Sequence, residues 1–344
     1  MKTVTDEFTG HKSGHVSQAK DSDTVSCQIS RFTGLVAAPF TPFLGDGSLN
    51  LDVIPEYARF LKQRGVSAAF ICGTTGECTS LSISEREAVA EAWLHEPVLP
   101  VIVHTGHTTL RDARRLAVHA QECGAVAVAA FAPFFFKPRN PVEMVEWCAA
   151  IAEVVPELPF YYYHIPSMTG ADMPVAEILE CAESRIPNLA GVKYTYEDID
   201  DFETCLRYRD HRFDLLFGRD ELLMEGWQHG ARGAVGSTYN YASPLYLRIL
   251  KALENGHPDE ARALQDLAIS MIDICNSAGV THLAASKALM GMLGVECGPV
   301  RLPLANPTPR QLSAMRDKLE ALGFFAPDFG GVVKKTSGAG NITK

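Results

Sequence analysis

Short apolar runs alternate along the chain with segments whose apolar positions have helical spacing. Eight runs recur at roughly thirty-residue intervals, which is the spacing of a βαβ unit. They are continuously apolar, so we expect parallel strands that are buried on both faces. Helical spacing follows each run, as in LDVIPEYARFLKQRG and SEREAVAEAWL. The predicted strands are LVAAPF from Leu35, VSAAFIC from Val66, PVIVH from Pro100, VAVAAF from Val126, LPFYYYH from Leu158, LAGVKY from Leu189, DLLF from Asp214 and GAVGS from Gly233.

Eight strand and helix units in about 225 residues predict a closed (β/α)₈ TIM barrel better than an open, doubly wound sheet. We place this barrel at residues 31–257. Residues 258–325 contain three more helical stretches and no strand run, and we expect them to form a C-terminal helical appendage. The segments 1–30 and 326–344 lack clear periodicity, so we expect a flexible N-terminal extension and a flexible tail.

Composition and charge narrow the class of protein. The 344 residues carry 31 Lys and Arg against 41 Asp and Glu, which gives a net charge of −10. Nucleic acids and anionic membranes attract basic proteins, so we expect neither as a partner. The nine cysteines are scattered without a C-x-x-C pair, and no apolar stretch is long enough to span a bilayer. We therefore expect a cytoplasmic protein with reduced thiols.

The active site of such a barrel lies at the carboxyl ends of the strands, so the polar residues there are candidates for chemistry. Lys193 stands in the apolar run LAGVKY, where a lysine would be buried. It either extends to the rim beside a carboxylate or acts as a nucleophile, because desolvation lowers the pKa of an amine and leaves it neutral. We favour a nucleophile that forms a Schiff base. Tyr163 ends the run before it, where core packing and proton transfer fit the pattern equally well.

The loop GTTGE after the second run carries two hydroxyls, those of Thr74 and Thr75, between glycines. Its local sequence favours a tight turn, and the alternative is a nest of amides and hydroxyls that binds a carboxylate or phosphate. The other candidate positions at strand ends are Thr195, Gly218, Asp220, Glu221 and Ser237.

Two histidines follow the third run. His104 and His107 could together contact a metal ion, but no third His, Cys or acidic ligand follows at a recognisable spacing. We therefore expect no metal in the site.

Three motifs occur in a characteristic order: GTTGE after the second run, YYYHIPSMTG at the fifth and GVKYT at the sixth. In order and separation they resemble the dihydrodipicolinate synthase / N-acetylneuraminate lyase family of class I pyruvate-dependent aldolases, from about Gly34 to the C-terminal helices. The resemblance implies that Lys193 forms an imine with pyruvate or with the substrate's ketone. It also implies that Thr74 and Thr75 bind the carboxylate, that Tyr163 carries a proton, and that no cofactor beyond this imine is required.

Positions at which this chain differs from some members of the family distinguish the synthase branch from the sugar-cleaving branch. Synthases have an arginine where this chain has Met168, whereas PFYYYHIPSMTG, LLFGRDELL and GAVGSTYNY resemble the sugar-cleaving branch. The resemblance implies reversible cleavage of N-acetylneuraminate to N-acetylmannosamine and pyruvate by a homotetramer. In that branch the positions that hold the sugar correspond here to Thr195, Gly218, Asp220, Glu221 and Ser237.

Several alternatives stay open from the sequence. The same imine serves aldolases or dehydratases that act on another 2-keto-3-deoxy sugar acid or on 4-hydroxy-2-oxoglutarate, and a third possibility is a non-catalytic barrel that senses a keto acid.

Many family members have a tyrosine after the fourth strand, where this chain has the segment Phe134-Phe135-Phe136. Proton transfer must then rest on Tyr163, a hydroxyl of GTTGE, the substrate carboxylate or water. The direction of Arg219 is not fixed by the pattern.

Overall fold

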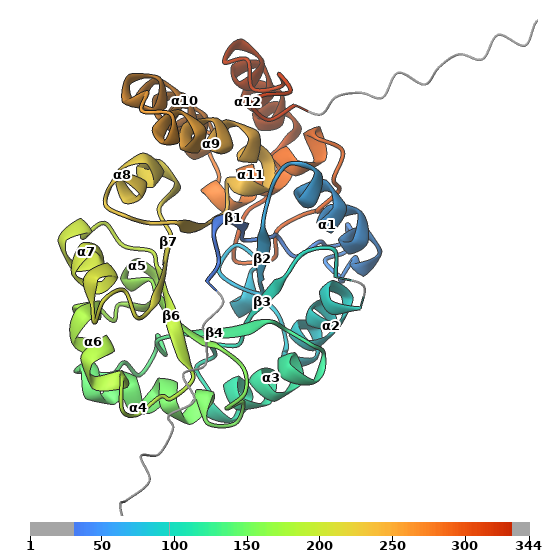
Figure 1. Cartoon of the computed structure of the whole chain (residues 1–344). Helices are drawn as coiled ribbons and strands as arrows, with labels where there is room; N and C mark the ends of the chain where they lie inside the picture. The colour runs from blue at the N-terminus through green and yellow to red at the C-terminus, as the bar shows by residue number, and fades with distance from the viewer. Residues whose placement is uncertain (1–30, 96, 332–344) are drawn as a thin grey trace, which may run out of the picture. The chain divides into compact units, whose positions relative to one another are not determined.

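The computed structural model describes residues 31–95 and 97–331. Its strands are β1 Gly34–Ala37, β2 Ala68–Ile71, β3 Val101–His104, β4 Ala127–Phe131, β5 Phe160–His164, β6 Leu189–Tyr194, β7 Asp214–Phe217 and β8 Gly233–Gly236. All pair in parallel in sequence order, and β8 pairs with β1 to close the barrel, with Ala37 opposite Gly236 (Figure 1). The predicted TIM barrel is confirmed.

The continuously apolar segments of the sequence form the strands, and both faces of these strands are buried. Every strand residue except Gly34 is buried. Because successive side chains of a strand point to opposite faces, Tyr161 and Tyr163 of β5 both point into the barrel. The Tyr161 hydroxyl donates to Asp214 Oδ2 at the start of β7 over 2.8 Å. Tyr161 therefore fills the barrel interior on the side of the amino-terminal ends of the strands, and Tyr163 lies at the carboxyl end of β5.

Helices follow each strand and surround the barrel (Figure 1). They are α1 Ile54–Gln63, α2 Ile83–Leu94, α3 Leu110–Glu122, α4 Pro141–Ala152, α6 Val175–Ala182, α7 Ile199–Arg207, α8 Leu223–Gln228 and α9 Tyr239–Glu254. Shorter turns are α5 Pro166–Thr169, η1 Leu51–Val53, η2 Cys78–Ser80 and η3 Asp220–Leu222. Side-chain caps define several N-termini: Ser82 forms a capping box with Glu85 before α2, and Asn140 caps α4.

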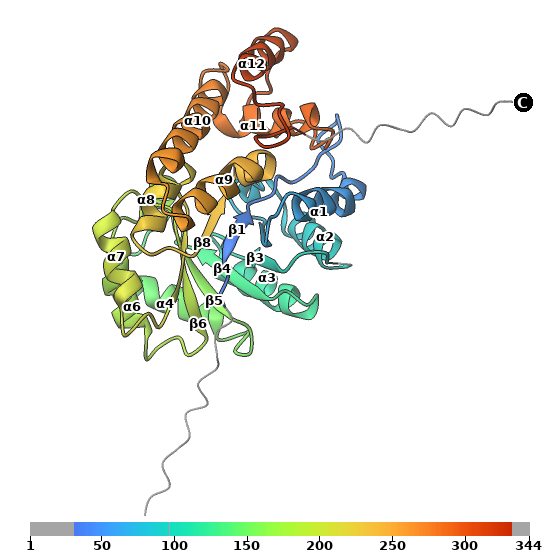
Figure 2. The same ribbon diagram turned by 45° about the horizontal axis from the view of Figure 1, so that its top comes forward.

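Three helices follow the barrel, as the sequence predicts: α10 Pro258–Asn276, α11 His282–Met292 and α12 Pro309–Ala321. Helix α10 packs along α9 and also contacts α11 and α12, so the three form one group beside the barrel (Figure 2). A buried ion pair between Lys287 of α11 and Glu77 after β2 joins this group to the barrel.

The chain continues in contact with the barrel after α12. Phe329 is buried, and the Arg64 guanidinium donates to the carbonyl oxygens of Gly330 and Gly331 over 3.0 and 2.8 Å. These contacts place the first six residues of the predicted flexible tail, 326–331, in the packed structure. The remainder of that tail and the predicted N-terminal extension lie outside the described residues. No helix within 31–95 or 97–331 combines the length and apolar character needed to cross a membrane.

Candidate active site

A cavity of about 290 Å³ opens at the carboxyl ends of the strands, where active sites of TIM barrels lie. All nine candidate residues from the sequence line it: Thr74, Thr75, Tyr163, Lys193, Thr195, Gly218, Asp220, Glu221 and Ser237. The barrel thus brings together side chains from the ends of β2, β5, β6, β7 and β8.

Lys193 of β6 is the buried amine of this cavity, with only 4% of its surface exposed. Its Nζ lies 4.1 Å from the centre of the Phe70 ring and 4.0 Å from the centre of the Tyr163 ring. Within the described residues, no carboxylate forms an ion pair with it. Burial lowers the pKa of Lys193 to about 7, although the charge of Asp220 opposes the shift. A large fraction of this amine is therefore neutral, and nucleophilic, near neutral pH.

Tyr163 presents a neutral phenol beside this amine. Burial raises the pKa of Tyr163 to about 12, so the hydroxyl keeps its proton at neutral pH. The hydroxyl oxygen lies 3.4 Å from Thr74 Oγ1. Because either hydroxyl can donate, the pair can pass a proton between the substrate and the loop after β2.

The GTTGE loop is held in place by its glutamate. Glu77 adopts a left-handed backbone conformation with φ of 54°, which is unusual for a residue with a side chain. Its Oε1 accepts from Lys287 Nζ over 2.7 Å, and its Oε2 accepts from the backbone N–H of Arg301 over 3.0 Å. Both carboxylate oxygens of Glu77 thus bind residues that follow the barrel in the chain. These contacts hold the loop in one conformation, in which Thr74 and Thr75 face the cavity.

Asp220 is the buried acid of the cavity. Its Oδ2 accepts from the backbone N–H of Thr238 over 2.9 Å and from the Thr238 hydroxyl over 2.6 Å. Burial, with a further contribution from the neighbouring charge of Glu221, raises the pKa of Asp220 to about 6. A Cβ on Gly236 would lie 1.9 Å from Asp220 Oδ1, so only glycine leaves room for this carboxylate.

The Arg219 side chain lines the cavity, whereas the sequence alone does not show whether it points into the cavity or away from it. Its Nη2 lies 2.7 Å from Glu197 Oε1, and its Nε lies 3.8 Å from Glu221 Oε2. The guanidinium therefore balances part of the acidic charge at the cavity mouth.

Residues from the C-terminal helices complete the cavity, and sequence reasoning missed them. Ile272 and Asn276 of α10 and His282 of α11 line the same space. The His282 imidazole bridges Asn276 Oδ1 through Nδ1 over 3.0 Å and Ser286 Oγ through Nε2 over 3.1 Å. No motif marks these positions, because they belong to helices that follow the last strand.

Other candidates from the sequence lie outside the cavity. His104 is buried, with Nδ1 2.9 Å from the carbonyl oxygen of Cys72, while His107 Nδ1 accepts from the backbone N–H of Thr109. The two histidines thus have separate, structural roles. Met168 lies in a second cavity of about 510 Å³, which is lined also by Phe134.

Comparison with known proteins agrees with this geometry. Residues 31–322 match the model of the Dihydrodipicolinate synthetase family. An N-acetylneuraminate lyase of Mus musculus is 39% identical over 302 residues, which cover 86% of this chain and 94% of that protein. Proteus mirabilis N-acetylneuraminate lyase superimposes with a TM-score of 0.83 at 38% identity, covering 86% of this chain and 99% of that one. A catalytic lysine mutant of Ruminococcus gnavus sialic acid aldolase superimposes with a TM-score of 0.80 at 26% identity, covering 85% and 95%. This chain therefore belongs to the dihydrodipicolinate synthetase family.

Proposed function

We propose that this protein is a Schiff-base lyase that reversibly cleaves N-acetylneuraminate to N-acetylmannosamine and pyruvate. One observation carries the proposal: a buried amine, Lys193, has a pKa lowered to about 7 in a cavity rich in hydroxyl and carboxylate groups. The similarity to N-acetylneuraminate lyases over most of the chain supports this choice of sugar.

The reaction begins with the neutral amine of Lys193, which attacks the C2 ketone of the open-chain sugar acid. Protonation of the carbinolamine hydroxyl and loss of water then give an iminium, in which the nitrogen takes the place of the ketone oxygen. The hydroxyls of Thr74 and Thr75 hold the adjacent carboxylate. This fixed geometry replaces a bimolecular encounter with an intramolecular one.

Cleavage follows when the C4 hydroxyl loses its proton. Tyr163 accepts this proton while its own passes to the substrate carboxylate, directly or through the Thr74 hydroxyl, which gives up its own proton as it receives one; the phenol therefore stays neutral. The C3–C4 electron pair flows into the iminium, N-acetylmannosamine departs as an aldehyde, and an enamine remains on Lys193. Protonation at C3 and hydrolysis by water then release pyruvate and the free amine. The iminium is itself the electron sink, so these steps call on no cofactor and no metal ion.

The remaining residues of the cavity are suited to a hydroxyl-rich tail. Carboxylates and hydroxyls can accept and donate several hydrogen bonds to neighbouring sugar hydroxyls. We assign this role to Thr195, Gly218, Asp220, Glu221 and Ser237. Gly218 can contact the sugar only through its backbone. A larger residue does not fit there, because its Cβ would lie 2.1 Å from Thr195 Oγ1.

The test is pyruvate release from N-acetylneuraminate, coupled to lactate dehydrogenase. We expect release by the wild type, none by Lys193→Ala, and unchanged release by Lys137→Ala, which alters an exposed lysine after β4. Borohydride with pyruvate should add mass at Lys193. If the adduct forms but N-acetylneuraminate is not cleaved, the substrate is instead another 2-keto-3-deoxy sugar acid or 4-hydroxy-2-oxoglutarate. Absence of both would favour a keto-acid-sensing barrel.

We also propose that the protein is a cytoplasmic homotetramer that works without nucleic-acid or membrane partners. Exposed aromatic and aliphatic side chains support self-association: Phe135, Phe136 and Leu302 are 77%, 85% and 86% exposed in the single chain. The cysteines of the described residues are free thiols, as suits a reducing compartment. Light scattering should give four times the chain mass, and Phe135→Ser/Phe136→Ser should lower it.

A further inference from the structure

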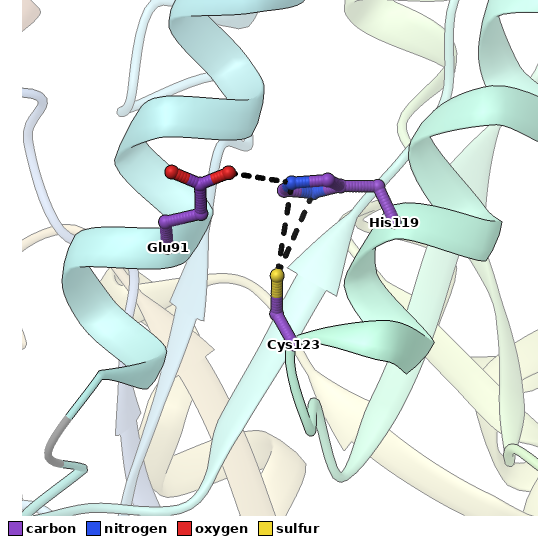
Figure 3. Close-up of side chains that lie close together, drawn as sticks. All are labelled: Glu91, His119 and Cys123. Atoms are coloured by element: carbon purple, nitrogen blue, oxygen red, sulfur yellow. Dashed lines mark hydrogen bonds and ion pairs between the residues drawn. The ribbon is translucent and has the colours of Figure 1, made fainter.

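A cluster of three possible metal ligands lies between α2 and α3, on the outer face of the barrel (Figure 3). Glu91 projects from α2, and His119 lies on α3 one turn before Cys123, which follows its last residue. Glu91 Oε1 is 3.0 Å from His119 Nε2, and Cys123 Sγ is 3.6 Å from the same nitrogen. One ligand atom of each side chain lies within 4.8 Å of the others. None of the three lines the active-site cavity.

These separations fit a tetrahedral zinc ion. Zinc binds nitrogen and oxygen at about 2.0 Å and thiolate sulfur at about 2.3 Å, so a tetrahedral site needs N–O distances of roughly 3.3 Å and N–S distances of roughly 3.5 Å. The observed separations, 3.0 and 3.6 Å, are close to these values. Cys123 Sγ also lies 3.9 Å from His119 Nδ1, so binding through Nε2 requires the thiol to move toward that nitrogen and the Glu91 carboxylate to shift outward. Imidazole, thiolate and carboxylate together are a donor set that favours zinc over magnesium or calcium.

A cysteine, histidine and glutamate in contact can also form a nucleophilic triad, but this geometry does not. In a triad the histidine meets the nucleophile with one nitrogen and the carboxylate with the other. Here Nε2 of His119 is the nitrogen closest to both groups, at 3.0 Å from Glu91 Oε1 and 3.6 Å from Cys123 Sγ, whereas Nδ1 lies farther from the thiol, at 3.9 Å.

Further carboxylates near the cluster favour a cation. Glu87 and Glu122 line the same surface hollow as His119, and among the described residues Glu87 pairs with Arg115 while Glu91 contacts His119. The Glu91 side chain is 62% exposed, so an ion can reach the cluster from solvent.

We propose that Glu91, His119 and Cys123 bind one zinc ion, with water as the fourth ligand, and that the ion ties α2 to α3. On binding, the Cys123 thiol releases its proton to solvent and coordinates as thiolate, neutral His119 coordinates through Nε2, and the direct Glu91–His119 hydrogen bond is replaced by two bonds to zinc. The site is separate from the cavity of Lys193 and serves the stability of the barrel wall.

The test uses the full chain, freed of metal by chelation. We expect one equivalent of zinc to bind per chain and to raise the melting temperature. Cobalt(II) at the same site should give a near-ultraviolet thiolate charge-transfer band. Cys123→Ser and His119→Gln should lose the band and the rise in melting temperature, while each keeps a cooperative thermal transition.

Two matched variants serve as controls. Cys181→Ser alters another partly buried free thiol, and His229→Gln alters a histidine that lies 3.7 Å from Glu203 and belongs to no cluster of three metal ligands among the described residues. Both should keep the band and the zinc stoichiometry. A charge-transfer band that survives in Cys123→Ser, or a wild type that binds no zinc equivalent, would overturn the proposal.

Discussion

Lys193 and Tyr163 are direct partners in the register of β6 and β5, and the Lys193 ammonium nitrogen lies 4.0 Å above the centre of the Tyr163 ring. The parallel pairing sets the amine and the phenol at the same height in the barrel. In the proposed mechanism, the substrate is bound to Lys193 through C2, and this pairing places Tyr163 on the neighbouring strand to receive the proton of the C4 hydroxyl.

Tyr163→Phe removes the proton carrier and keeps the ring beside Lys193. We expect kcat for pyruvate release to fall about 100- to 10,000-fold, the range for loss of a general acid or base. Borohydride trapping of pyruvate on Lys193 should persist, because imine formation needs the amine and not this hydroxyl. Tyr162→Phe, on the outer face of the same strand, should keep kcat within a few fold. Equal losses of trapping and turnover in Tyr163→Phe would contradict the assigned role.

Catalysis should depend on pH through the amine. Only neutral Lys193 attacks the ketone, so kcat/KM should fall about tenfold per pH unit below the pKa of about 7. The charge of Asp220 raises the pKa of Lys193, so Asp220→Asn should move this acid limb to lower pH. Ser237→Ala alters the same cavity without removing a charge and should reduce kcat/KM without moving the limb. A limb that stays in place in Asp220→Asn would show that another group controls it.

The buried amine should also lower the stability of the fold. In the unfolded chain Lys193 titrates near its ordinary pKa of 10.5, and in the folded chain near 7. Below pH 7 both states are protonated and burial of the charge destabilises the fold fully. Between pH 7 and 10.5 this destabilisation is progressively lost. Lys193→Met should therefore raise the melting temperature most at pH 6 and hardly at all above pH 10. A gain that is the same at both pH values would argue against a buried ammonium.

The ion pair of Glu77 and Lys287 should stabilise both the fold and the GTTGE loop. Each side chain is only 1% exposed, so Glu77→Gln leaves an unpaired ammonium in the interior. We expect the free energy of unfolding in urea to fall by about 3 to 5 kcal/mol. KM should rise as the loop loses its anchor. The double variant Glu77→Gln/Lys287→Met should recover part of the stability, and two additive losses would contradict direct coupling.

A single methyl group at Gly236 should disrupt the acid of the cavity. The Cβ of Gly236→Ala would lie 1.9 Å from Asp220 Oδ1 and would force this carboxylate away from Thr238. We expect kcat/KM to fall about 100-fold, a loss typical of a small displacement in a catalytic site. Gly45→Ala, whose Cβ would meet nothing within 4 Å, is the matched control and should behave as wild type. Normal kinetics in Gly236→Ala would show that Asp220 is dispensable.

The chain's local pattern predicts the barrel and much of its site. Strands are recognisable because both faces are buried and the runs are continuously apolar. Lys193 stands out because an ionisable group interrupts such a run, and its place at a strand end follows from topology. The family motifs then assign a partner to it, Tyr163.

What the pattern misses are contacts between distant segments. Glu77 and Lys287 are 210 positions apart, and neither lies in a run whose period predicts the other. His282 belongs to a helix without a catalytic motif. Glu91 and the pair His119 and Cys123 meet only because α2 and α3 pack side by side. Such pairs depend on tertiary packing, which a local period does not encode.

The cavity is built from two separate parts of the chain. The strands carry Lys193, the residue proposed to form the imine, whereas Ile272, Asn276 and His282 form a wall supplied by α10 and α11. Substitutions in this wall should therefore alter the aldehyde that is accepted while Lys193 and its neighbours stay untouched. Substrate choice and imine formation can thus be changed independently in this protein, because the wall takes no part in forming the barrel.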